Sequence, residues 1–383
     1  MQKLQQMSAF IHQQKDWPHF TWESDEIVNV LSEARNLQGR LMGKMESIGF
    51  VLRNEALLGT LTLDIIKSTE IEGEILNPDQ VRSSIARRLG MKIAGSVDSD
   101  RNVDGMVEMM IDATKNCFKP LTAERLFDWH AALFPTGRSG MYKIRVANWR
   151  HDTTGPMQVV SGAMGKERIH FQAPDSTRVE KEMIQFLRWF NKPKEMDLVI
   201  KAAVAHLWFV TIHPFDDGNG RITRALTDML LAQSDNSTQR FYSMSAQIRL
   251  ERKQYYEILE KTQKGNLDIT EWIKWFLKCL IKALKSTDKV LNNVLFKADF
   301  WQKHSAIILN ERQKKVLKKM LDGFNGKLTS SKWAKIGKCS KDTAIRDING
   351  LIEMNILQKS EAGGRSTSYE LKTIHPDHKS TFL

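Results

Sequence analysis

The chain has 383 residues, which is enough for a buried core and for more than one domain. It carries 57 lysines and arginines against 45 aspartates and glutamates, a net charge of +12, which favours an anionic partner such as a nucleic acid, a nucleotide or a lipid surface. The three cysteines (Cys117, Cys279 and Cys339) lack CxxC spacing, so neither a disulfide framework nor a zinc site is indicated. The first residues lack the apolar run of a signal peptide, and the stretch LVIKAAVAHLWFV is too short to span a bilayer. We therefore expect a cytoplasmic protein without a membrane partner.

Helical periodicity runs through most of the chain. The apolar spacing over residues 57–66 predicts one helix, and the Asn-Pro pair at 77–78 predicts the cap and first turn of another. The segments VDGMVEMMIDAT, TAERLFDWHAALF and VEKEMIQFLRWF continue the helical period. A long helix is expected from about 196 to 211, ending before Pro214, and a further helix from about Asn219.

One region breaks the helical pattern. Between Gly137 and Pro174, the segment GPMQVVSGAMGKERIHFQAP contains two short β-prone runs around a turn rich in glycine. This pattern predicts a β-hairpin.

The C-terminal segment is strongly basic. From residue 311 onward there are fifteen lysines and arginines against eight aspartates and glutamates, so this segment carries +7 of the net charge. It reads as a helix, a short helix (SSKWAKIG), a turn, a helix beginning KDTAIRD and a hairpin with AGGR at its tip. This order resembles a winged helix, in which KDTAIRD would begin the recognition helix and Arg365 would lie in the wing.

The stretch HPFDDGNGRITRAL, residues 213–226, combines groups that suit phosphate. The start of the helix near Asn219 would expose unpaired amide groups with a partial positive charge. Gly218 and Gly220 allow the backbone to approach a ligand closely, and the side chain of Asn219 is able to donate to a phosphate oxygen. The stretch therefore predicts an anion site.

Charged side chains in the same stretch add chemistry. Arg221 and Arg224 are one turn apart, so both guanidinium groups could face one polyphosphate. Asp217 could hold a Mg²⁺ ion that bridges phosphates. His213 could accept the proton of an incoming hydroxyl, a role that is worth about 10²–10⁴-fold in rate. Together these residues predict a site for phosphoryl-type transfer.

Each part also has an ordinary structural interpretation. A single histidine near a helix end commonly serves packing, Gly-x-Gly can be a simple turn, and the arginines could be solvated. Asp216 and Asp217 could cap the next helix, and we expect this of Asp216. The combination at this spacing is far more specific than its parts.

The segment HPFDDGNGRITR resembles the Fic motif, His-x-Phe-x-Asp/Glu-Gly-Asn-Gly/Lys-Arg-x-x-Arg, at every defined position. Residues from about 104 to 280 are similar to a Fic core, with the predicted hairpin as its flap. Fic enzymes typically transfer AMP from ATP to a hydroxyl side chain of a target protein. The resemblance implies a mainly α fold: a helical Fic core with a β-hairpin flap, an N-terminal helical region before it and a winged helix-turn-helix domain after it.

The resemblance implies a role for each motif residue. His213 would be the catalytic base, Asp217 would bind Mg²⁺ and Arg224 would reach the γ-phosphate of ATP. Residues 218–221 would bind the α- and β-phosphates, and Phe215 would be an apolar anchor for the loop. The full set of implied nucleotide-binding residues is Gly218, Asn219, Gly220, Arg221, Ile222, Thr223, Arg224, Tyr255, Tyr256, Ser161, Gly162, Ala163 and Met164.

Two parts of that set lie outside the motif. Residues 161–164 match the part of a Fic flap that registers the target by strand addition and borders the nucleotide; an ordinary surface hairpin is the alternative. The segment ERKQYYEILEKTQ resembles the one whose Tyr-Tyr pair, here Tyr255 and Tyr256, lines the adenine pocket. Gln263 stands where an Asn may follow this pair in the family, a departure that puts an adenine hydrogen bond there in doubt.

An inhibitory pattern precedes the core. The segment STEIEGEI fits Ser/Thr-x-x-x-Glu-Gly/Asn with Ser68, Glu72 and Gly73. In Fic proteins with this pattern, the glutamate pairs with the second arginine of the motif, which is Arg224 here. A carboxylate in the guanidinium fork would remove the γ-phosphate contact and hold ATP in a pose unsuited to in-line attack.

Two neighbouring glutamates, Glu70 and Glu74, fall outside this pattern, and we expect both to face solvent. The pattern is short, so a solvated helix acid is the alternative interpretation of Glu72 as well. The Fic motif about 140 residues downstream favours the inhibitory interpretation.

These observations divide the chain into an N-terminal region (1–100) with the inhibitory pattern, a Fic core (101–290) and a winged-helix-like domain (304–383). The expected function is AMP transfer from ATP to hydroxyl side chains of target proteins (AMPylation), with Mg²⁺ as cofactor and Glu72 as autoinhibitor. The alternatives are a de-AMPylating Fic enzyme and a DNA-binding regulator with a Fic sensor core. Expected partners are ATP and target proteins, with the chain itself, a second copy as a homodimer and DNA as further candidates. The nucleotide base preference and the target stay open.

Overall fold

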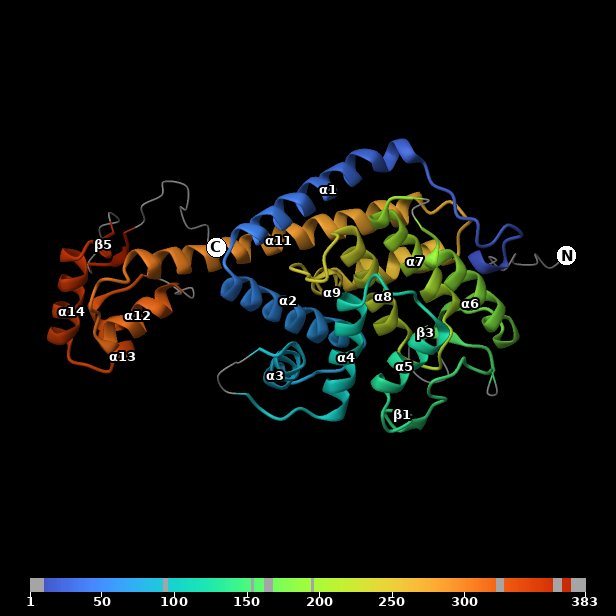
Figure 1. Ribbon diagram of the computed structural model, residues 1–383, viewed down its shortest axis with the longest axis horizontal. Coiled ribbons are helices and arrows are strands. Elements are labelled where there is room, and N and C mark those ends of the chain that lie inside the picture. The colour runs from blue at the N-terminus through green and yellow to red at the C-terminus, as the bar shows by residue number, and fades with distance from the viewer. Residues whose placement is uncertain are drawn as a thin grey trace. The chain divides into compact units, whose positions relative to one another are not determined.

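The computed structural model describes residues 10–91, 96–152, 155–161, 168–193, 196–321, 327–360 and 367–372. These residues are mainly helical, with three short antiparallel strand pairs (Figure 1). The predicted mainly α fold is therefore confirmed. The chain divides into two compact units, Met1–Leu291 and Asn292–Leu383.

The elements of the first unit are, in chain order, a 3₁₀ helix η1 (Ile11–Gln13), α1 (Ser24–Ser47), α2 (Phe50–Ile71), α3 (Pro78–Leu89), α4 (Arg101–Lys115), α5 (Ala123–Leu133), β1 (Arg138–Ser139), β2 (Tyr142–Lys143), β3 (Gln158–Ser161), β4 (Arg168–Gln172), α6 (Ser176–Asn191), α7 (Leu198–Ile212), α8 (Asn219–Ser234), α9 (Met244–Leu250), α10 (Arg252–Gln263) and the first part of α11 (Thr270–Lys303). The second unit contains the end of α11, then α12 (Glu311–Leu321), α13 (Ser330–Gly337), α14 (Lys341–Glu353), β5 (Leu357–Lys359) and β6 (Tyr369–Leu371).

Helices α7 and α8 form the centre of the first unit. All residues of α7 from Val199 to Ile212 are buried, as expected for a helix that is apolar on every face. Helix α8 packs against it, with Ile222, Leu226 and Leu230 fully buried. Both predicted helices are confirmed within two residues, and the turn that joins them contains the Fic-like motif.

Helix α2 packs against α3, α4, α8 and α9. It is followed by the Asn-Pro start of α3, where the Asn77 side chain accepts the backbone N–H groups of Asp79 and Gln80, as the sequence predicts. Helix α2 carries the STEIEGEI pattern at its C-terminal end. The packing of α2 on α8 brings that end to the motif turn.

Helix α1 lies alongside the first part of α11 (Figure 1). Glu26 pairs with Lys274 at 2.9 Å and Glu33 pairs with Lys285 at 2.6 Å. Because the partner numbers rise together, the two helices run parallel. These exposed pairs fix register more than they add stability.

The predicted β-hairpin is present as β3 and β4. The strands are antiparallel, with Gln158 opposite Gln172 and Ser161 opposite Arg168, and the register shifts between Val159 and Val160. A second, shorter pair, β1 and β2, was not predicted; it lies between α5 and the hairpin.

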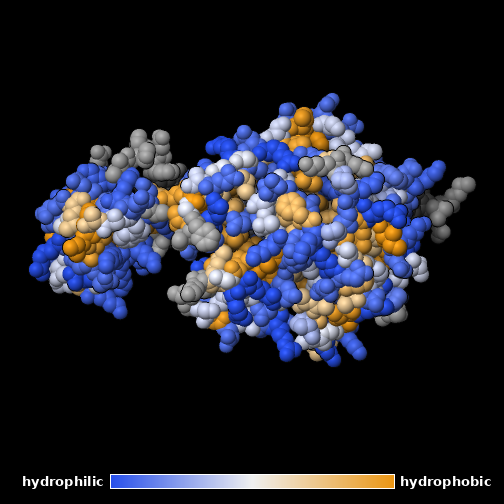
Figure 2. Space-filling view, viewed as in Figure 1, coloured by the Kyte–Doolittle hydropathy of each residue, from blue (hydrophilic) through white to orange (hydrophobic). Residues whose placement is uncertain are grey.

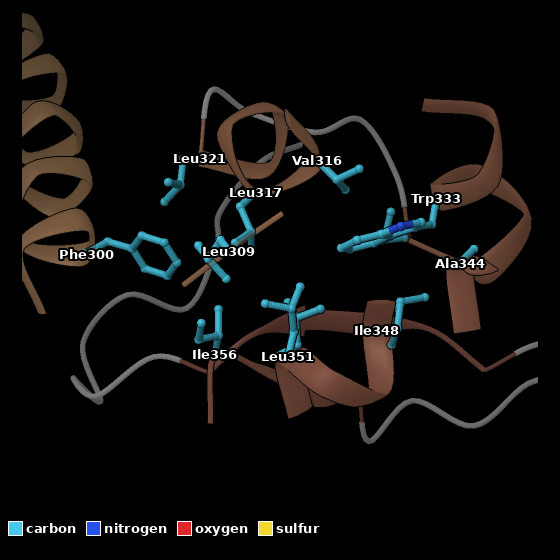
Figure 3. Close-up of a cluster of buried hydrophobic side chains, with 12 residues drawn as sticks. Phe300, Leu309, Val316, Leu317, Leu321, Trp333, Ala344, Ile348, Leu351 and Ile356 are labelled. Atoms are coloured by element: carbon cyan, nitrogen blue, oxygen red, sulfur yellow. The ribbon is translucent and has the colours of Figure 1, made fainter. Parts of the chain in front are cut away.

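The second unit has its own core, a cluster of buried apolar side chains from α11 to β5 (Figure 3). Trp333 of α13 is fully buried and lies at one end of this cluster, next to Ala344 and Ile348 of α14. The predicted order of helix, short helix, helix and strand pair is confirmed. The AGGR tip, including Arg365, lies outside the described residues.

A buried carboxylate joins the helices of the second unit. Asp347 of α14 accepts hydrogen bonds from Asn310 at 3.0 Å, from Arg312 at 2.9 and 3.1 Å, and from the Trp333 indole N–H at 3.4 Å. Although burial raises it, hydrogen bonds from Arg312 and Asn310 hold the pKa of Asp347 below its usual value. The paired carboxylate therefore fixes the three helices in one arrangement.

Hydrophilic side chains cover most of the visible face of each unit, with hydrophobic areas between them (Figure 2). Among the residues that the structure describes, none of the helices combines the length and apolar composition needed to cross a membrane.

A hydrogen-bond chain runs through the buried interior between α7, α8 and α10. The side chain of Thr227 donates to the carbonyl of Thr223, so the Nδ1–H of His206 donates to the Thr227 hydroxyl at 2.9 Å. The Tyr255 hydroxyl then donates to Nε2 of His206 at 2.9 Å. Burial lowers the pKa of His206 to about 3, so this imidazole is neutral in the folded chain.

We expect this histidine to make the fold sensitive to acid. The unfolded chain binds a proton at His206 near its usual pKa of ~6.5, and the folded chain does so only near pH 3, so stability falls as the pH drops below ~6.5. At pH 5 the expected loss is about 2 kcal/mol. Urea unfolding at pH 7 and pH 5 should show this loss in the wild type and a smaller loss in His206→Gln. Equal losses in the two proteins would contradict the assignment.

Candidate active site

His213 lies at the end of α7 in the left-handed backbone conformation, with φ 52°. Its backbone carbonyl accepts the Arg150 Nε–H at 2.7 Å, which holds the turn. Its Nδ1 lies 3.1 Å from the carbonyl oxygen of Val210. A carbonyl only accepts, so the proton of the neutral imidazole is on Nδ1 and Nε2 keeps a lone pair.

Burial lowers the pKa of His213 below its usual value. The imidazole is therefore neutral near pH 7 and able to accept a proton at Nε2. The next apolar residue, Phe215, is fully buried, as predicted for a loop anchor. The buried Phe215 therefore anchors the motif loop that begins at His213, the predicted base.

The start of α8 has the geometry expected of an anion site. Gly218 has φ 80°, and a Cβ atom there would lie 2.8 Å from the Phe134 ring, so the position requires glycine. The Asn219 side chain does not point outward as expected: its oxygen accepts the Phe215 N–H at 3.0 Å and its amide donates to the Phe215 carbonyl at 2.7 Å. Asn219 therefore closes the loop, and an anion at the start of α8 would meet backbone amide groups rather than this side chain.

The side chains of Ile222 and Thr223 are fully buried. Thr223 also donates its hydroxyl to the carbonyl of Asn219 at 2.7 Å. These two side chains pack the core beneath the motif rather than offer a surface to a ligand, because they lie on the inner face of α8.

The two aspartates of the motif have different roles from each other. Asp216 accepts the backbone N–H of Arg145 at 2.8 Å, so the expectation that it caps α8 is wrong; the residue that precedes the helix is Gly218. Asp217 stays 42% exposed, and its Oδ1 accepts the N–H of Gly218 at 2.5 Å. Its Oδ2 accepts the hydroxyl of Ser139.

Asp217 fits Mg²⁺ as one carboxylate ligand among phosphate and water ligands. Its carboxylate is an exposed oxygen donor whose orientation is fixed by hydrogen bonds. Within the described part of the chain, no group of three or more His, Cys, Asp or Glu side chains could hold a metal ion. A metal here would therefore need ligands from the nucleotide as well as from Asp217.

Arg224 makes the contact predicted from the inhibitory pattern. Its Nη2 donates to Glu72 Oε1 at 2.7 Å and to the Ser68 carbonyl at 2.9 Å, and its Nε donates to the Ser68 hydroxyl at 2.8 Å. The guanidinium is buried, at 2% exposure, whereas Glu72 is 31% exposed. Gly73 follows with φ 87°, a conformation that favours glycine and turns the chain away from α2.

The Glu72 carboxylate also lies against the start of α8. A Cβ atom built on Gly220 would be 2.2 Å from Glu72 Oε1, so only glycine leaves room for the carboxylate. Glu72 is also close enough to His213 for its charge to affect the pKa of the imidazole. One anionic group thus contacts the helix N-terminus and Arg224 and lies near the predicted base.

The guanidinium of Arg221 forms an ion pair with a second carboxylate, that of Glu74. Its Nη1 lies 3.1 Å from Glu74 Oε2, and the guanidinium packs over the Phe134 ring at 5.0 Å. Glu74 is half-exposed, in line with the expectation that it faces solvent, but it also contacts Arg221, which was not predicted, because residues after Gly73 turn back over the motif helix.

Glu70 also differs from expectation. Its side chain is 21% exposed and pairs with Lys67 at 2.7 Å and with Arg249 at 3.4 Å. Among the ion pairs of the described residues, Glu70 has neither motif arginine as its partner, so it offers a natural comparison with Glu72 and Glu74.

The predicted tyrosine pair is divided between core and surface. Tyr255 is 2% exposed and its hydroxyl is bonded to His206, whereas Tyr256 is 37% exposed with Arg252 over its ring at 5.2 Å. Burial, together with the charge of Glu72, raises the pKa of Tyr256. Tyr256 therefore lies near Glu72. Gln263 is buried, and its amide donates to the Thr211 hydroxyl at 3.2 Å.

The predicted flap is fixed to α10. Ser161, at the end of β3, lies 2.5 Å from His170 Nε2, and His170 Nδ1 lies 2.6 Å from Glu260. Although burial raises it, hydrogen bonds from Lys264, His170 and Arg168 lower the pKa of Glu260 to about 2. The other predicted flap residues, Gly162, Ala163 and Met164, lie outside the described residues.

Four residues that hold the site were not found from the sequence: Glu74, His130, Ser139 and Arg150. Arg150 is 1% exposed and connects His213 with the carbonyl of Pro174. Each acts through a contact distant along the chain, and none belongs to a local spacing pattern.

Two parts of the chain match known protein domains. Residues 120–231 match the Fic/DOC family, and residues 10–91 match a domain of unknown function, DUF4172. The chain is 35% identical over 104 residues to proteins named protein adenylyltransferase Fic from Drosophila grimshawi and Drosophila melanogaster. That stretch is 27% of this chain, and the chain spans about a fifth (20%) of these relatives' length.

The fold has a counterpart of similar length. A Fic family protein from Desulfovibrio desulfuricans G20 superposes with a TM-score of 0.52 at 20% identity, over 92% of this chain and 97% of that one. The likeness shows a shared fold. The matched residues 120–231, which include the motif at the α7–α8 turn, support a Fic/DOC domain in this part of the chain.

Proposed function

We propose that this chain transfers AMP from ATP to a hydroxyl side chain of a target protein. The observation that carries this proposal is the position of the Glu72 carboxylate. An anion rests against Gly220 at the start of α8, bonds Arg224 and lies near the neutral His213. A phosphate group of ATP would take this place, because helix N-terminal amides and guanidinium groups suit phosphate.

In the proposed reaction, the target hydroxyl oxygen attacks the α-phosphorus of ATP. The bond from the α-phosphorus to the oxygen that bridges to the β-phosphate breaks, and pyrophosphate leaves. The hydroxyl proton goes to Nε2 of His213, whose Nδ1–H stays on Val210. The amides at the start of α8, with Arg221 and Arg224, stabilise the charge on the phosphates. Bound Mg²⁺ would supply further charge neutralisation, and Asp217 would hold it.

The same geometry supports an inhibitory role for the end of α2. Glu72 occupies Arg224, which is then not available to orient a γ-phosphate. Glu74 occupies Arg221 in the same way. The segment from 72 to 74 thus places two carboxylates on the two motif arginines, in the manner of two phosphates. We infer that the chain is autoinhibited through both.

We expect the Glu74–Arg221 ion pair to stabilise the inhibited state less than the Glu72–Arg224 ion pair does. The Glu74–Arg221 pair has one half-exposed partner, so we expect it to be worth at most about 1 kcal/mol. Glu74→Gln is therefore expected to tighten ATP binding by about fivefold or less, as measured by calorimetry. Glu70→Gln removes the same charge two residues before Glu72 and should leave ATP affinity unchanged. A similar gain in both variants would mean that general charge, not Arg221, is responsible.

The function is tested by incubating the wild type and Glu72→Gly with α-labelled ATP, Mg²⁺ and cell lysate. Label on protein from the Glu72→Gly variant, and none with His213→Ala in the same background, is the expected result. The absence of label on any protein, with ATP bound and the fold intact, would contradict AMP transfer. Label on the chain itself would identify automodification.

A second candidate function is the removal of AMP from a target protein. Glu72 is 31% exposed and lies near His213, so its carboxylate could position a water molecule for attack on the phosphorus. Incubation of the wild type with labelled, AMP-bearing protein distinguishes the two directions. Release of label that depends on Glu72 would favour removal.

The second unit suggests DNA as a further partner, in line with its resemblance to a winged helix. The solvent-facing side of its helices is rich in exposed lysines: Lys314, Lys315, Lys318 and Lys319 on α12, Lys335 on α13, Lys338 after it and Lys341 at the start of α14. A surface of this charge suits nucleic acid phosphates.

If this surface binds DNA, the affinity of the full chain for a duplex should fall steeply with salt. Each phosphate contact releases counterions and adds about −0.9 to the slope of log K against log salt. Lys335→Glu with Lys341→Glu should weaken binding and reduce this slope, as measured by fluorescence anisotropy. Binding that does not respond to salt, or no binding to any duplex, would favour a protein contact instead.

A further inference from the structure

The loop that carries Asp217 is held by residues outside the Fic motif. His130 of α5 is fully buried, and its Nδ1 accepts the backbone N–H of Ala147 at 3.1 Å. The proton of the neutral imidazole is therefore on Nε2, which lies 3.2 Å from the carbonyl oxygen of Asp217 and donates to it. His130 thus fixes the backbone of the predicted metal ligand.

The same imidazole also packs on the loop anchor. The rings of His130 and Phe215 are stacked, with centroids 4.3 Å apart and an interplanar angle of 11°. One side chain therefore supports both Phe215 and the carbonyl of Asp217, two residues further along.

Ser139 holds the other end of Asp217. The hydroxyl of Ser139, in β1, donates to Oδ2, while the N–H of Gly218 donates to Oδ1. Arg221 lies 3.8 Å from Oδ1, which adds a weaker electrostatic contact. Both carboxylate oxygens are thus oriented, yet the side chain remains 42% exposed.

From this arrangement we propose that His130 and Ser139 are positioning residues that orient Asp217 for a divalent cation bound together with nucleotide phosphate. The inference rests on the proposed function, because it requires that site to bind nucleotide. Mg²⁺ demands near-ideal octahedral geometry, so a single protein carboxylate must already point correctly. Partners that orient a metal ligand commonly account for about 10–100-fold in metal affinity.

The test uses the full chain and Mn²⁺ as the probe. Free Mn²⁺ is measured by electron paramagnetic resonance during titration, with and without ATP, and ATP binding is measured separately in EDTA. Ser139→Ala removes only the hydroxyl, and His130→Phe keeps an aromatic ring against Phe215 while removing both hydrogen bonds. Each variant should weaken Mn²⁺ binding in the presence of ATP by about 10–100-fold. ATP binding in EDTA should change by less than about threefold, since the positive groups at the start of α8 are untouched.

Leu126→Ala is the matched control. Leu126 is fully buried one turn before His130 on α5, so its loss destabilises the same helix without removing a hydrogen bond to the loop. The same loss of Mn²⁺ affinity in Leu126→Ala would overturn the proposal, as would wild-type affinity in Ser139→Ala. If His130→Phe does not fold, Ser139→Ala decides the matter. A wild type whose Mn²⁺ binding does not depend on ATP would instead overturn the proposed nucleotide site itself.

Discussion

Replacing His213 with alanine is expected to lower the rate of AMP transfer by about 10²–10⁴-fold, the usual contribution of a general base. The Nδ1–H of His213 donates to the Val210 carbonyl, so Nε2 is the atom that would receive the proton of the attacking hydroxyl. The measurement is the initial rate of label transfer from α-labelled ATP, in the Glu72→Gly background where activity is expected. ATP affinity should change little, because the helix N-terminus and both arginines remain.

The backbone at this position calls for a second variant. His213 has φ 52°, a conformation that alanine adopts at a cost and asparagine tolerates better. His213→Asn therefore removes the base with less strain on the turn between α7 and α8. Both variants should lose transfer, and His213→Asn should keep the thermal stability of the N-terminal unit more fully than His213→Ala. Wild-type transfer rates in either variant would show that the histidine is structural.

The pH dependence gives an independent check on the same residue. Only neutral His213 can accept a proton, so activity falls as the pH drops through its pKa. Because burial holds that pKa below the usual value, the acid limb of the rate profile should lie below pH ~6.5. An acid limb centred at or above that pH would point to a different base, or to an imidazole exposed to solvent.

Local patterns account for what could be predicted. The motif from His213 to Arg224 is contiguous, so its helix end, tight turn and helix start follow from neighbouring residues, and the structure has all three. The Glu72–Arg224 contact was predicted across 152 residues only because each partner lies within a recognisable pattern. The hairpin at β3 and β4 followed from two short β-prone runs around a turn that contains glycine.

Contacts without a local pattern could not be predicted. Glu74 contacts Arg221, which is 147 residues away in the sequence. This contact depends on the turn at Gly73 rather than on the helical period of α2. His130 lies on α5 with the spacing of an ordinary core residue, so only the packing of α5 reveals its bond to Asp217. Asp216 was expected to be a cap because of its place before a helix, but the competing N–H of Arg145 takes its carboxylate.

Asn219 illustrates a different kind of error. Its side chain suits a phosphate oxygen in chemistry, and the sequence does not say which way it points. In the structure it bonds both backbone groups of Phe215, because a buried loop must satisfy its own polar groups before it can present any to a ligand. A phosphate bound here would therefore contact the backbone amides and the arginines.

Replacing Glu72 with glycine is expected to raise AMP transfer by about 5–150-fold, including transfer onto the chain itself. In the structure the Glu72 carboxylate is bonded to the guanidinium of Arg224, which is 2% exposed. Breaking such a coupling shifts the equilibrium towards the active state by ~1–3 kcal/mol. The freed Arg224 keeps its bonds to Ser68, so it stays in place to meet a γ-phosphate. The initial rate of label incorporation at matched ATP concentration is the measurement.

Two further variants separate the charge of Glu72 from its backbone position. Glu72 ends α2 and precedes Gly73, so a glycine there also loosens the end of the helix. Glu72→Gln keeps the side chain and removes the charge, and it should give most of the gain. Glu70→Gln removes a charge that pairs with Lys67 and Arg249, and it should change the rate by no more than about 0.5 kcal/mol in free-energy terms.

The gain should depend on Arg224. A Glu72→Gly, Arg224→Ala double variant is expected to fall back to low activity, because releasing an arginine that is absent achieves nothing. The cycle of wild type, two single variants and the double variant isolates this coupling from the separate effect of each change. Equal gains with and without Arg224 would mean that Glu72 acts instead through Gly220, by blocking the start of α8 with its carboxylate. Equal rates in the wild type and Glu72→Gly would show that the contact is structural and that the end of α2 does not restrain the site.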